Sequence, residues 1–130
     1  MKQLYFHKIR NVNIMNAEKI REYCLSKKEV TEGMPFGETV LVFKVCNKIF
    51  LLLALDAIPL QFNAKCQPEY AIALRENYDA VIPGYHMNKA HWNTVILDGS
   101  LPEKLIFEQI DNSYALIVNS LPKKLKQNLQ

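Results

Sequence analysis

Apolar residues recur at helical spacing in three segments of the chain, of which the first two are short. Residues 17–27 carry one apolar stripe behind Asn16, which supplies an N-cap. The segment "QPEYAIALRENY" has Pro68 in its first turn, where a missing amide donor costs nothing, and Glu69 beside the positive end of the helix dipole. Both segments are therefore predicted to be amphipathic helices.

The third helical segment, residues 102–120, carries the longest apolar stripe. Ser100 and Glu103 match the S-x-x-E capping box that opens many helices. Asn112–Ser113, near the middle, is a candidate break between two helices. The basic tail "LPKKLKQNLQ" contains a proline that suits the start of one last helical turn.

Three segments between the first two helices have strand character. "ETVLVFKVC" is rich in β-branched and aromatic residues, "IFLLLALD" is apolar almost throughout, and "LQFNAKC" alternates apolar with polar residues. Asn47–Lys48 offers a tight hairpin turn between the first two, and "SKKEVTEG" before them is predicted to be a polar turn. The apolar middle strand should lie at the centre of a sheet or be covered on both faces.

Two further strands follow the second helix, the short segment "DAVIPG" and residues 89–97. The predicted order is helix, three strands, helix, two strands, helix. Because strands joined by short turns pair antiparallel, we expect an α+β fold: a two-layer sandwich with a mostly antiparallel sheet and helices on one face. Residues 14–126 are expected to form a single domain, with residues 1–13 as an N-terminal arm or leading strand.

Composition narrows the function classes without selecting one. The 130 residues are 49% hydrophobic and 22% charged, which is typical of a globular chain, and the net charge of +3 permits an anionic partner without requiring one. Cys24, Cys46 and Cys66 have no C-x-x-C spacing, which argues against a disulfide framework and a zinc knuckle. The longest apolar run, "IFLLLAL", is too short to cross a bilayer, so we expect a cytoplasmic protein that does not insert into membranes.

The segment "GYHMNKAHWNTV", residues 84–95, concentrates the candidate chemistry. If residues 89–97 form a strand, Lys89, His91 and Asn93 share one face and Trp92 packs on the other. His86 lies five residues from His91, with no acidic or thiol ligand in the segment, so no metal site is expected. The sequence contains no nucleophile elbow, phosphate loop or zinc-protease motif, and neither a catalytic residue nor a cofactor is predicted.

A nucleic-acid partner would need cations and hydrogen-bonding side chains on one surface. Asn88 and Asn93 could reach base edges, and Tyr85 could stack on a base. The candidate cations are spread along the chain: Lys44, Lys65, Arg75, Lys89, Lys123, Lys124 and Lys126.

Several short motifs together resemble the MmcQ/YjbR family. They are "PFG" at 35–37, "FKV" at 43–45, "KCQPE" at 65–69, "PGYHMNK" with "HWNTV" at 83–95, and "LPKK" at 121–124. The resemblance covers roughly residues 15–125. It implies a CyaY-like, secretion-chaperone-like fold with the order α-β(3)-α-β(2)-α. It also implies DNA binding in a double-wing mode, in which β-hairpins approach the phosphates of a duplex with weak sequence specificity.

Carried onto this chain, the resemblance implies a nucleic-acid site that includes lysines outside the segment 84–95. Its predicted members are Lys44, Lys65, Tyr85, His86, Asn88, Lys89, His91 and Asn93. Double-stranded DNA is the expected partner, and a monomer is the expected state.

Two alternatives stay open at the level of sequence. One is a chaperone-like module that binds a protein or peptide through the sheet face or an edge strand. The other is a small-molecule site around His86 and His91, in a concave pocket with Tyr85 and Glu38 nearby. In the second alternative, Cys66 is a candidate nucleophile.

Overall fold

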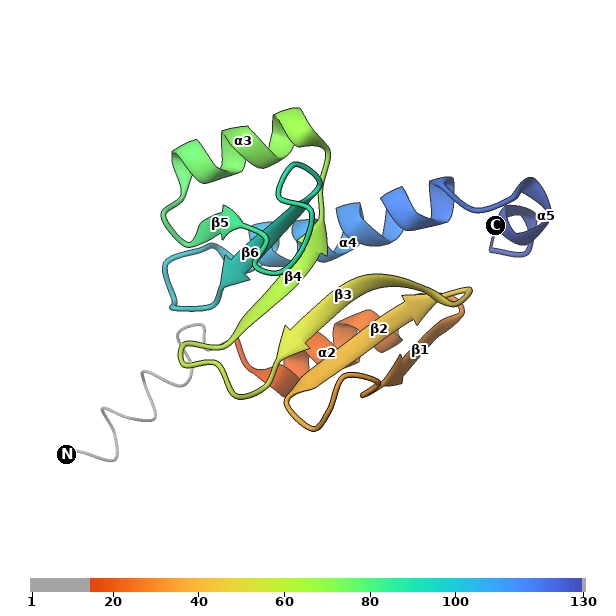
Figure 1. The fold of residues 1–130 in the computed structure, drawn as a ribbon, viewed down its shortest axis with the longest axis horizontal. Helices are drawn as coiled ribbons and strands as arrows, with labels where there is room; N and C mark the ends of the chain where they lie inside the picture. The colour runs from red at the N-terminus through yellow and green to blue at the C-terminus, as the bar shows by residue number, and fades with distance from the viewer. Residues whose placement is uncertain (1–14, 130) are drawn as a thin grey trace.

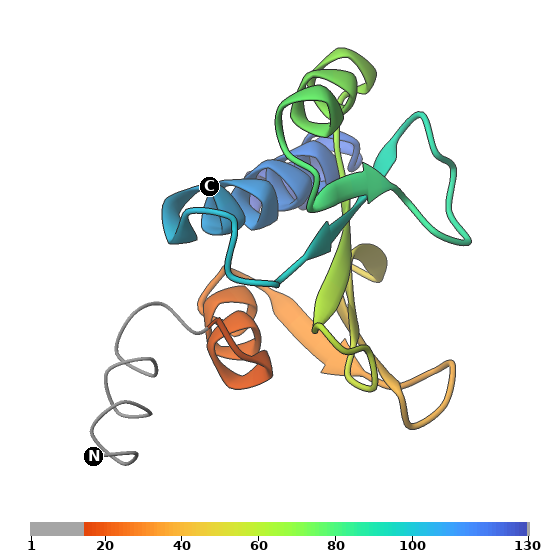
Figure 2. The ribbon, with the colours of Figure 1, turned by 90° about the vertical axis from the view of Figure 1, so that its left-hand side faces the viewer.

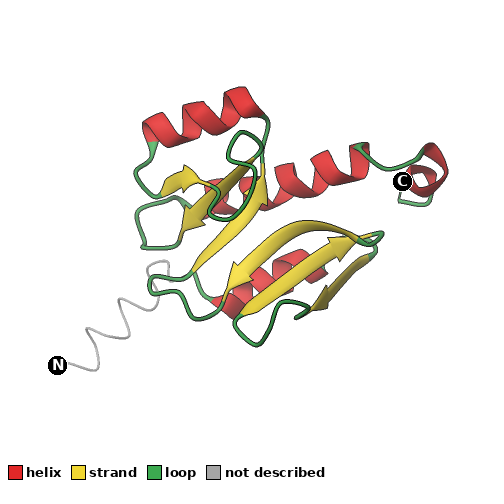
Figure 3. Ribbon diagram, viewed as in Figure 1, coloured by secondary structure: helices red, strands yellow, loops and turns green. Residues whose placement is uncertain are grey.

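The computed structural model describes residues 15–129, so the predicted arm of residues 1–13 lies outside the described part of the chain. Six strands and four helices occupy the described part (Figures 1 and 3). The strands are β1 (Val30–Gly33), β2 (Val40–Val45), β3 (Lys48–Ala54), β4 (Gln61–Lys65), β5 (Val81–Pro83) and β6 (Trp92–Ile96). The helices are α2 (Ala17–Leu25), α3 (Pro68–Asn77), α4 (Glu103–Asn119) and α5 (Lys123–Gln127).

All six strands form one antiparallel sheet in the order β1-β2-β3-β4-β6-β5. Helix α4 packs across β3 and β4, α2 packs on β1, and α3 packs on β5, so the main core lies between the sheet and the helices (Figure 2). Its largest side chains are Phe43, Phe50, Leu51, Leu53, Phe62, Ile20 and Ile110. The predicted two-layer α+β architecture is confirmed.

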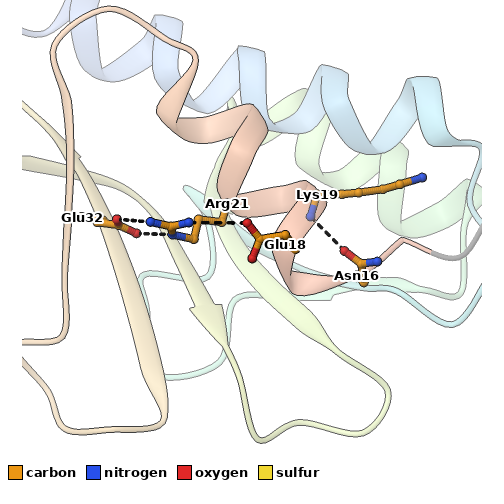
Figure 4. A network of polar contacts seen from close by, with 5 residues as sticks. All are labelled: Asn16, Glu18, Lys19, Arg21 and Glu32. Carbon is orange, nitrogen blue, oxygen red and sulfur yellow. Dashed lines mark hydrogen bonds and ion pairs between the residues drawn. The ribbon is translucent and has the colours of Figure 1, made fainter.

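Strand β1 is the main difference from the predicted order. The segment "SKKEVTEG", predicted to be a polar turn, contains four residues that pair with β2. The polar sequence is explained by the position of β1 at the sheet edge, where Thr31 and Glu32 stay exposed. Glu32 also accepts hydrogen bonds from Nε and Nη2 of Arg21, at 2.8 and 2.7 Å, and this pair joins α2 to β1 (Figure 4).

Helix starts follow the sequence signals in two cases and depart from them in a third. The side chain of Asn16 accepts from the amide of Lys19, and Pro68 opens α3, as predicted. The capping box at Ser100 does not form. Its hydroxyl donates to Asp98 instead, and α4 begins after Pro102.

Two details of the central strands also differ from the predictions. The hairpin turn is centred on Cys46–Asn47, one residue earlier than predicted, and both residues have positive φ. Helix α4 continues through Ser113, which is fully buried and faces a bulge in β3. The hydroxyl of Ser113 donates to the carbonyl of Phe50 and accepts from the amide of Lys65, so it pairs two backbone groups beside the bulge.

Candidate functional site

One face of the sheet is left open by the helices. Along β2, β3, β4 and β6, core residues alternate with residues of the opposite side, which we call the open face. Its middle row is aligned across the four strands: Val42, Leu52, Asn63 and Thr94. Lys44 and Lys65 belong to the same face, at the end of the strands where β2 turns into β3. Because they lie two strands apart, their backbones are separated by about 10 Å.

Two loops project from the sheet on the side of the open face (Figure 2). Loop 34–39 joins β1 to β2, and loop 84–91 joins β5 to β6. Both extend away from α2 and α4. Since β3 and β4 lie between β2 and β6, the two loops stand on opposite sides of the open face.

A pocket with a volume of about 460 Å³ lies between these loops. Its mostly apolar lining comes from the strands and from both loops: Phe36, Val40, Ile49, Leu52, Ala54, Gln61, Phe62, Asn63, Tyr85, His86 and Met87. This volume, combined with an apolar wall and a few polar side chains, is typical of ligand-binding pockets.

The rim of the pocket is aromatic and exposed. Phe36 of loop 34–39 is 63% exposed and Tyr85 of loop 84–91 is 65% exposed. The ring of His86 lies 4.1 Å from that of Tyr85, centroid to centroid, and His86 has a φ of 61°. A side chain with positive φ is uncommon outside glycine, and such residues occur often at binding sites.

Loop 84–91 is held at its base by a close backbone approach. The amide of Gly84 donates to the carbonyl of Trp92 at 2.8 Å. A Cβ atom at position 84 would lie 2.8 Å from the Cβ of Trp92 and 2.9 Å from its carbonyl oxygen. Only glycine therefore permits this approach without a shift of the backbone.

Arg75 of α3 holds the other end of the loop. Its Nε donates to Oδ1 of Asn93 at 2.7 Å, and its Nη2 donates to the carbonyls of Lys89 and Trp92. The candidate cation Arg75 therefore uses Nε and Nη2 to fix loop 84–91 to β6, and no ion pair among residues 15–129 neutralises its charge.

Asn63 fixes the start of the same loop from the open face. Its Nδ2 donates to the carbonyl of Tyr85 at 3.2 Å, and its Oδ1 accepts from the hydroxyl of Thr94 at 2.5 Å. The amide of Tyr85 in turn donates to Oγ1 of Thr94 at 3.2 Å. Three hydrogen bonds thus set the position from which Tyr85 and His86 reach the pocket.

The structure brings most of the predicted site residues to one side of the molecule. Lys44 and Lys65 lie on the open face, and Tyr85 and His86 line the pocket. Three more are exposed in loop 84–91: Asn88, Lys89 and His91. The side chain of Asn88 accepts from the amide of Ala90, so part of its hydrogen-bonding capacity serves the loop itself.

Asn93 does not belong to this surface. Strand β6 begins at Trp92, and its register turns Asn93 toward the core, opposite Ala64. Asn93 is only 1% exposed and accepts from Arg75, so its side chain cannot reach a base edge. Trp92 and Asn93 lie on opposite faces of the strand, as predicted. The face of Asn93, which was expected to be exposed and to carry cations, is the one that packs against the core.

No acidic side chain of the described residues forms an ion pair with the lysines near the pocket. Among residues 15–129, the ion pairs join Arg21 to Glu18 and Glu32, and Lys27 to Asp111. None involves Lys44, Lys65 or Lys89. Strand residues of the open face include no carboxylate. Glu38 and Asp56 flank the opposite end of this face, beside the Val40–Ala54 pair.

The pocket matches only part of the predicted small-molecule site. Tyr85 and His86 line it, whereas its lining does not include His91 or Glu38. Burial raises the pKa of the Cys66 thiol to about 11, so this thiol is protonated near neutral pH. Because the thiolate is the reactive form, Cys66 is a poor nucleophile.

Phe36, Leu52 and Met87 were missed by the site prediction although they line the pocket. A signal for Leu52 was present in "IFLLLALD". Its neighbours Leu51 and Leu53 face the core, so Leu52 must face the other side of the sheet. The strand lies at the centre of the sheet as predicted, but its second face is open and not covered.

Comparison with known proteins places this geometry in a family. The sequence model of the family described as YjbR matches residues 25–116. The chain belongs to the YjbR family. It is 33% identical over 115 residues to the uncharacterized protein YjbR of Escherichia coli K12, covering 88% of this chain and 98% of that protein. It is also 37% identical over 91 residues to the uncharacterized protein YbdF of Escherichia coli O157:H7, covering 69% and 74%.

Solved structures show the same fold. A Deinococcus radiodurans protein with a DUF419 domain superposes with a TM-score of 0.84 at 32% identity, over 89% of this chain and 88% of that one. A Pseudomonas syringae protein gives a TM-score of 0.69 at 29% identity, over 78% and 98%. These names establish family and fold and state no activity. In the described part of the chain, no helix is both long and apolar enough to cross a membrane.

Proposed function

We propose that this YjbR-family protein binds DNA through the open face and its two loops. The observation that carries the proposal is the placement of Lys44 and Lys65 on one face, beside loop 84–91 with Lys89. These three lysines have no ion-pair partner among the described residues. A polyanion would supply the missing counter-charge.

The two loops support a double-wing contact. Loop 84–91 stands at the lysine end of the open face and loop 34–39, which contains Glu38, stands diagonally across it, so both would contact a duplex that lies across the face. Exposed side chains of Asn88 and His91 in loop 84–91 would add hydrogen bonds to the phosphate backbone. The resulting affinity is mainly electrostatic, so sequence specificity is expected to be weak.

A salt titration tests the proposal. Fluorescence anisotropy measures duplex DNA binding at about 50 and 200 mM salt for the natural chain and for a Lys44→Gln/Lys65→Gln/Lys89→Gln variant. The variant should bind more weakly. The slope of log affinity against log salt should fall by about 0.9 for each phosphate that the protein no longer neutralises, or about 2–3 in total.

A matched control separates the open face from overall charge. Lys19→Gln/Lys104→Gln/Lys123→Gln removes the same charge from helical and terminal positions. This variant should retain nearly the natural salt slope. An equal reduction in both variants would refute the surface, and no binding of duplex at low salt would refute DNA binding.

A further inference from the structure

The pocket between the loops has no use in a contact with phosphates. Its floor of Val40, Leu52 and Ala54 offers no donor to an anion, and burying a charge there would be costly. A duplex displays phosphates and base edges, while the flat faces of its bases are stacked inside. A duplex lying on the open face would therefore cover the pocket without filling it.

The rim of the pocket carries aromatic rings on which the face of an unpaired base can stack. Phe36 stands on one side and Tyr85 with His86 on the other, and all three side chains are exposed. Exposed aromatic rings beside a positively charged surface are the means by which proteins bind single strands, because each base can stack on them. Phe36 and Tyr85 are both more than 60% exposed and flank an apolar pocket, and exposed apolar patches of this kind mark binding sites.

A free amide lies in the same pocket. Gln61 lines it and makes no side-chain hydrogen bond to any of residues 15–129. A carboxamide can both donate and accept, which suits the mixed donors and acceptors of a base edge. Asn63, by contrast, uses its amide to hold Tyr85 and Thr94.

We infer that the pocket receives one unpaired nucleobase, so that the preferred nucleic acid is single-stranded or locally unpaired. This inference rests on the proposed function and names the class of nucleic acid. The adjoining phosphates would reach the lysine end of the face. Asn63 in the pocket and Lys65 are two residues apart on one strand face, about 7 Å along β4.

Competition between two probes tests the inference with the full chain. The probes are an oligodeoxythymidine of about 12 nucleotides and a blunt duplex of the same length, each compared at low salt. The natural chain should bind the single strand about tenfold more tightly than the duplex. Phe36→Ala should weaken single-strand binding by about tenfold and leave duplex binding nearly unchanged.

A control variant outside the pocket and a second pocket variant complete the experiment. Ile72→Ala removes a half-exposed aliphatic side chain from α3, away from the pocket, and should change neither affinity. Ala54→Leu fills the pocket floor and should reduce single-strand binding selectively. Both variants are used only if their circular dichroism spectra match that of the natural chain, which shows that they fold.

The outcomes separate this inference from the proposed function. A 2-aminopurine placed in the single strand should be quenched by stacking in the natural chain and not in Phe36→Ala. Equal affinity for both probes, unchanged in the pocket variants, would overturn the inference and leave duplex binding standing. If the lysine triple variant binds both probes as the natural chain does, the proposed surface fails as well.

Discussion

The two faces of the sheet use apolar residues in opposite ways. On the helix-covered face, Phe43 and Leu51 are fully buried, so their apolar area contributes to stability. On the open face, Val40 and Leu52 from the same two strands are only partly buried and line a pocket. Val42, on the same face, is only 1% exposed and contributes to stability, but the partly exposed side chains beside it remain available to a ligand. One strand can therefore supply the core with one set of positions and a binding surface with the other.

Two phenylalanines give the sharpest test of that difference. Phe43→Ala should lower the free energy of unfolding by about 3–5 kcal/mol, because it leaves a cavity between sheet and helices. Phe36→Ala, the same change on the open side, should alter it by less than about 0.5 kcal/mol, because the ring is mostly in water. Chemical denaturation of both variants measures this. Comparable losses would mean that loop 34–39 belongs to the structural core.

Gly84 tests whether the open face depends on the anchoring of loop 84–91. Gly84→Ala forces a Cβ against Trp92 and should destabilise the protein by about 1–3 kcal/mol. Gly33→Ala is the matched control, since a Cβ there meets nothing within 4 Å. Thermal and urea unfolding of both variants check the expectation. An unchanged free energy of unfolding in Gly84→Ala would show that the backbone at the base of loop 84–91 can shift without loss of stability.

The smallest expected effect lies on the helix side, at the α2–β1 pair of Figure 4. The hydrogen bonds from Arg21 lower the pKa of Glu32 below its usual range. A carboxyl whose folded pKa is lowered stabilises the fold above its unfolded pKa, and this contribution disappears as the pH falls through the folded value.

Glu32→Gln should therefore be slightly less stable than the natural chain at neutral pH and equal to it in acid. The difference is small because the pair is exposed to solvent. Urea denaturation at pH 7 and about pH 3 measures it. A difference that persists in acid would assign the effect to packing of the side chain and not to its charge.

Most of the fold could be predicted because periodicity reports burial directly. The alternation in "LQFNAKC" and the helical stripe of residues 102–120 both appear in the structure as expected. The polar edge strand β1 could not be predicted, because its side chains are exposed to solvent or contact Arg21. They therefore leave no apolar alternation in the sequence. The helix break predicted at Asn112–Ser113 was wrong for a related reason. A buried serine inside a helix is explained only by backbone groups far away in the sequence, those of Phe50 and Lys65.

Some of the residues around the pocket could be predicted from the sequence, but its shape could not. The exposed residues of segment 84–95 are recognisable from the sequence as candidates, and Tyr85 and His86 indeed line the pocket. That Asn93 points inward depends on where β6 begins, which strand propensity does not fix to one residue. The pocket itself depends on Phe36 approaching from a distant loop, and no local pattern reports such a contact.

The order of strands also fixes the width of the binding surface, which is the distance between the bases of its two loops. Loops 34–39 and 84–91 leave from β2 and β6, which are joined rung by rung through β3 and β4. Three inter-strand steps across the sheet, and the four residues along β6 from the row of Val40 to Trp92, set their bases about 20 Å apart. Hydrogen-bonded ladders resist stretching. Whatever enters between them must match that width, since the loops can tilt at their tips but the frame that carries them cannot widen.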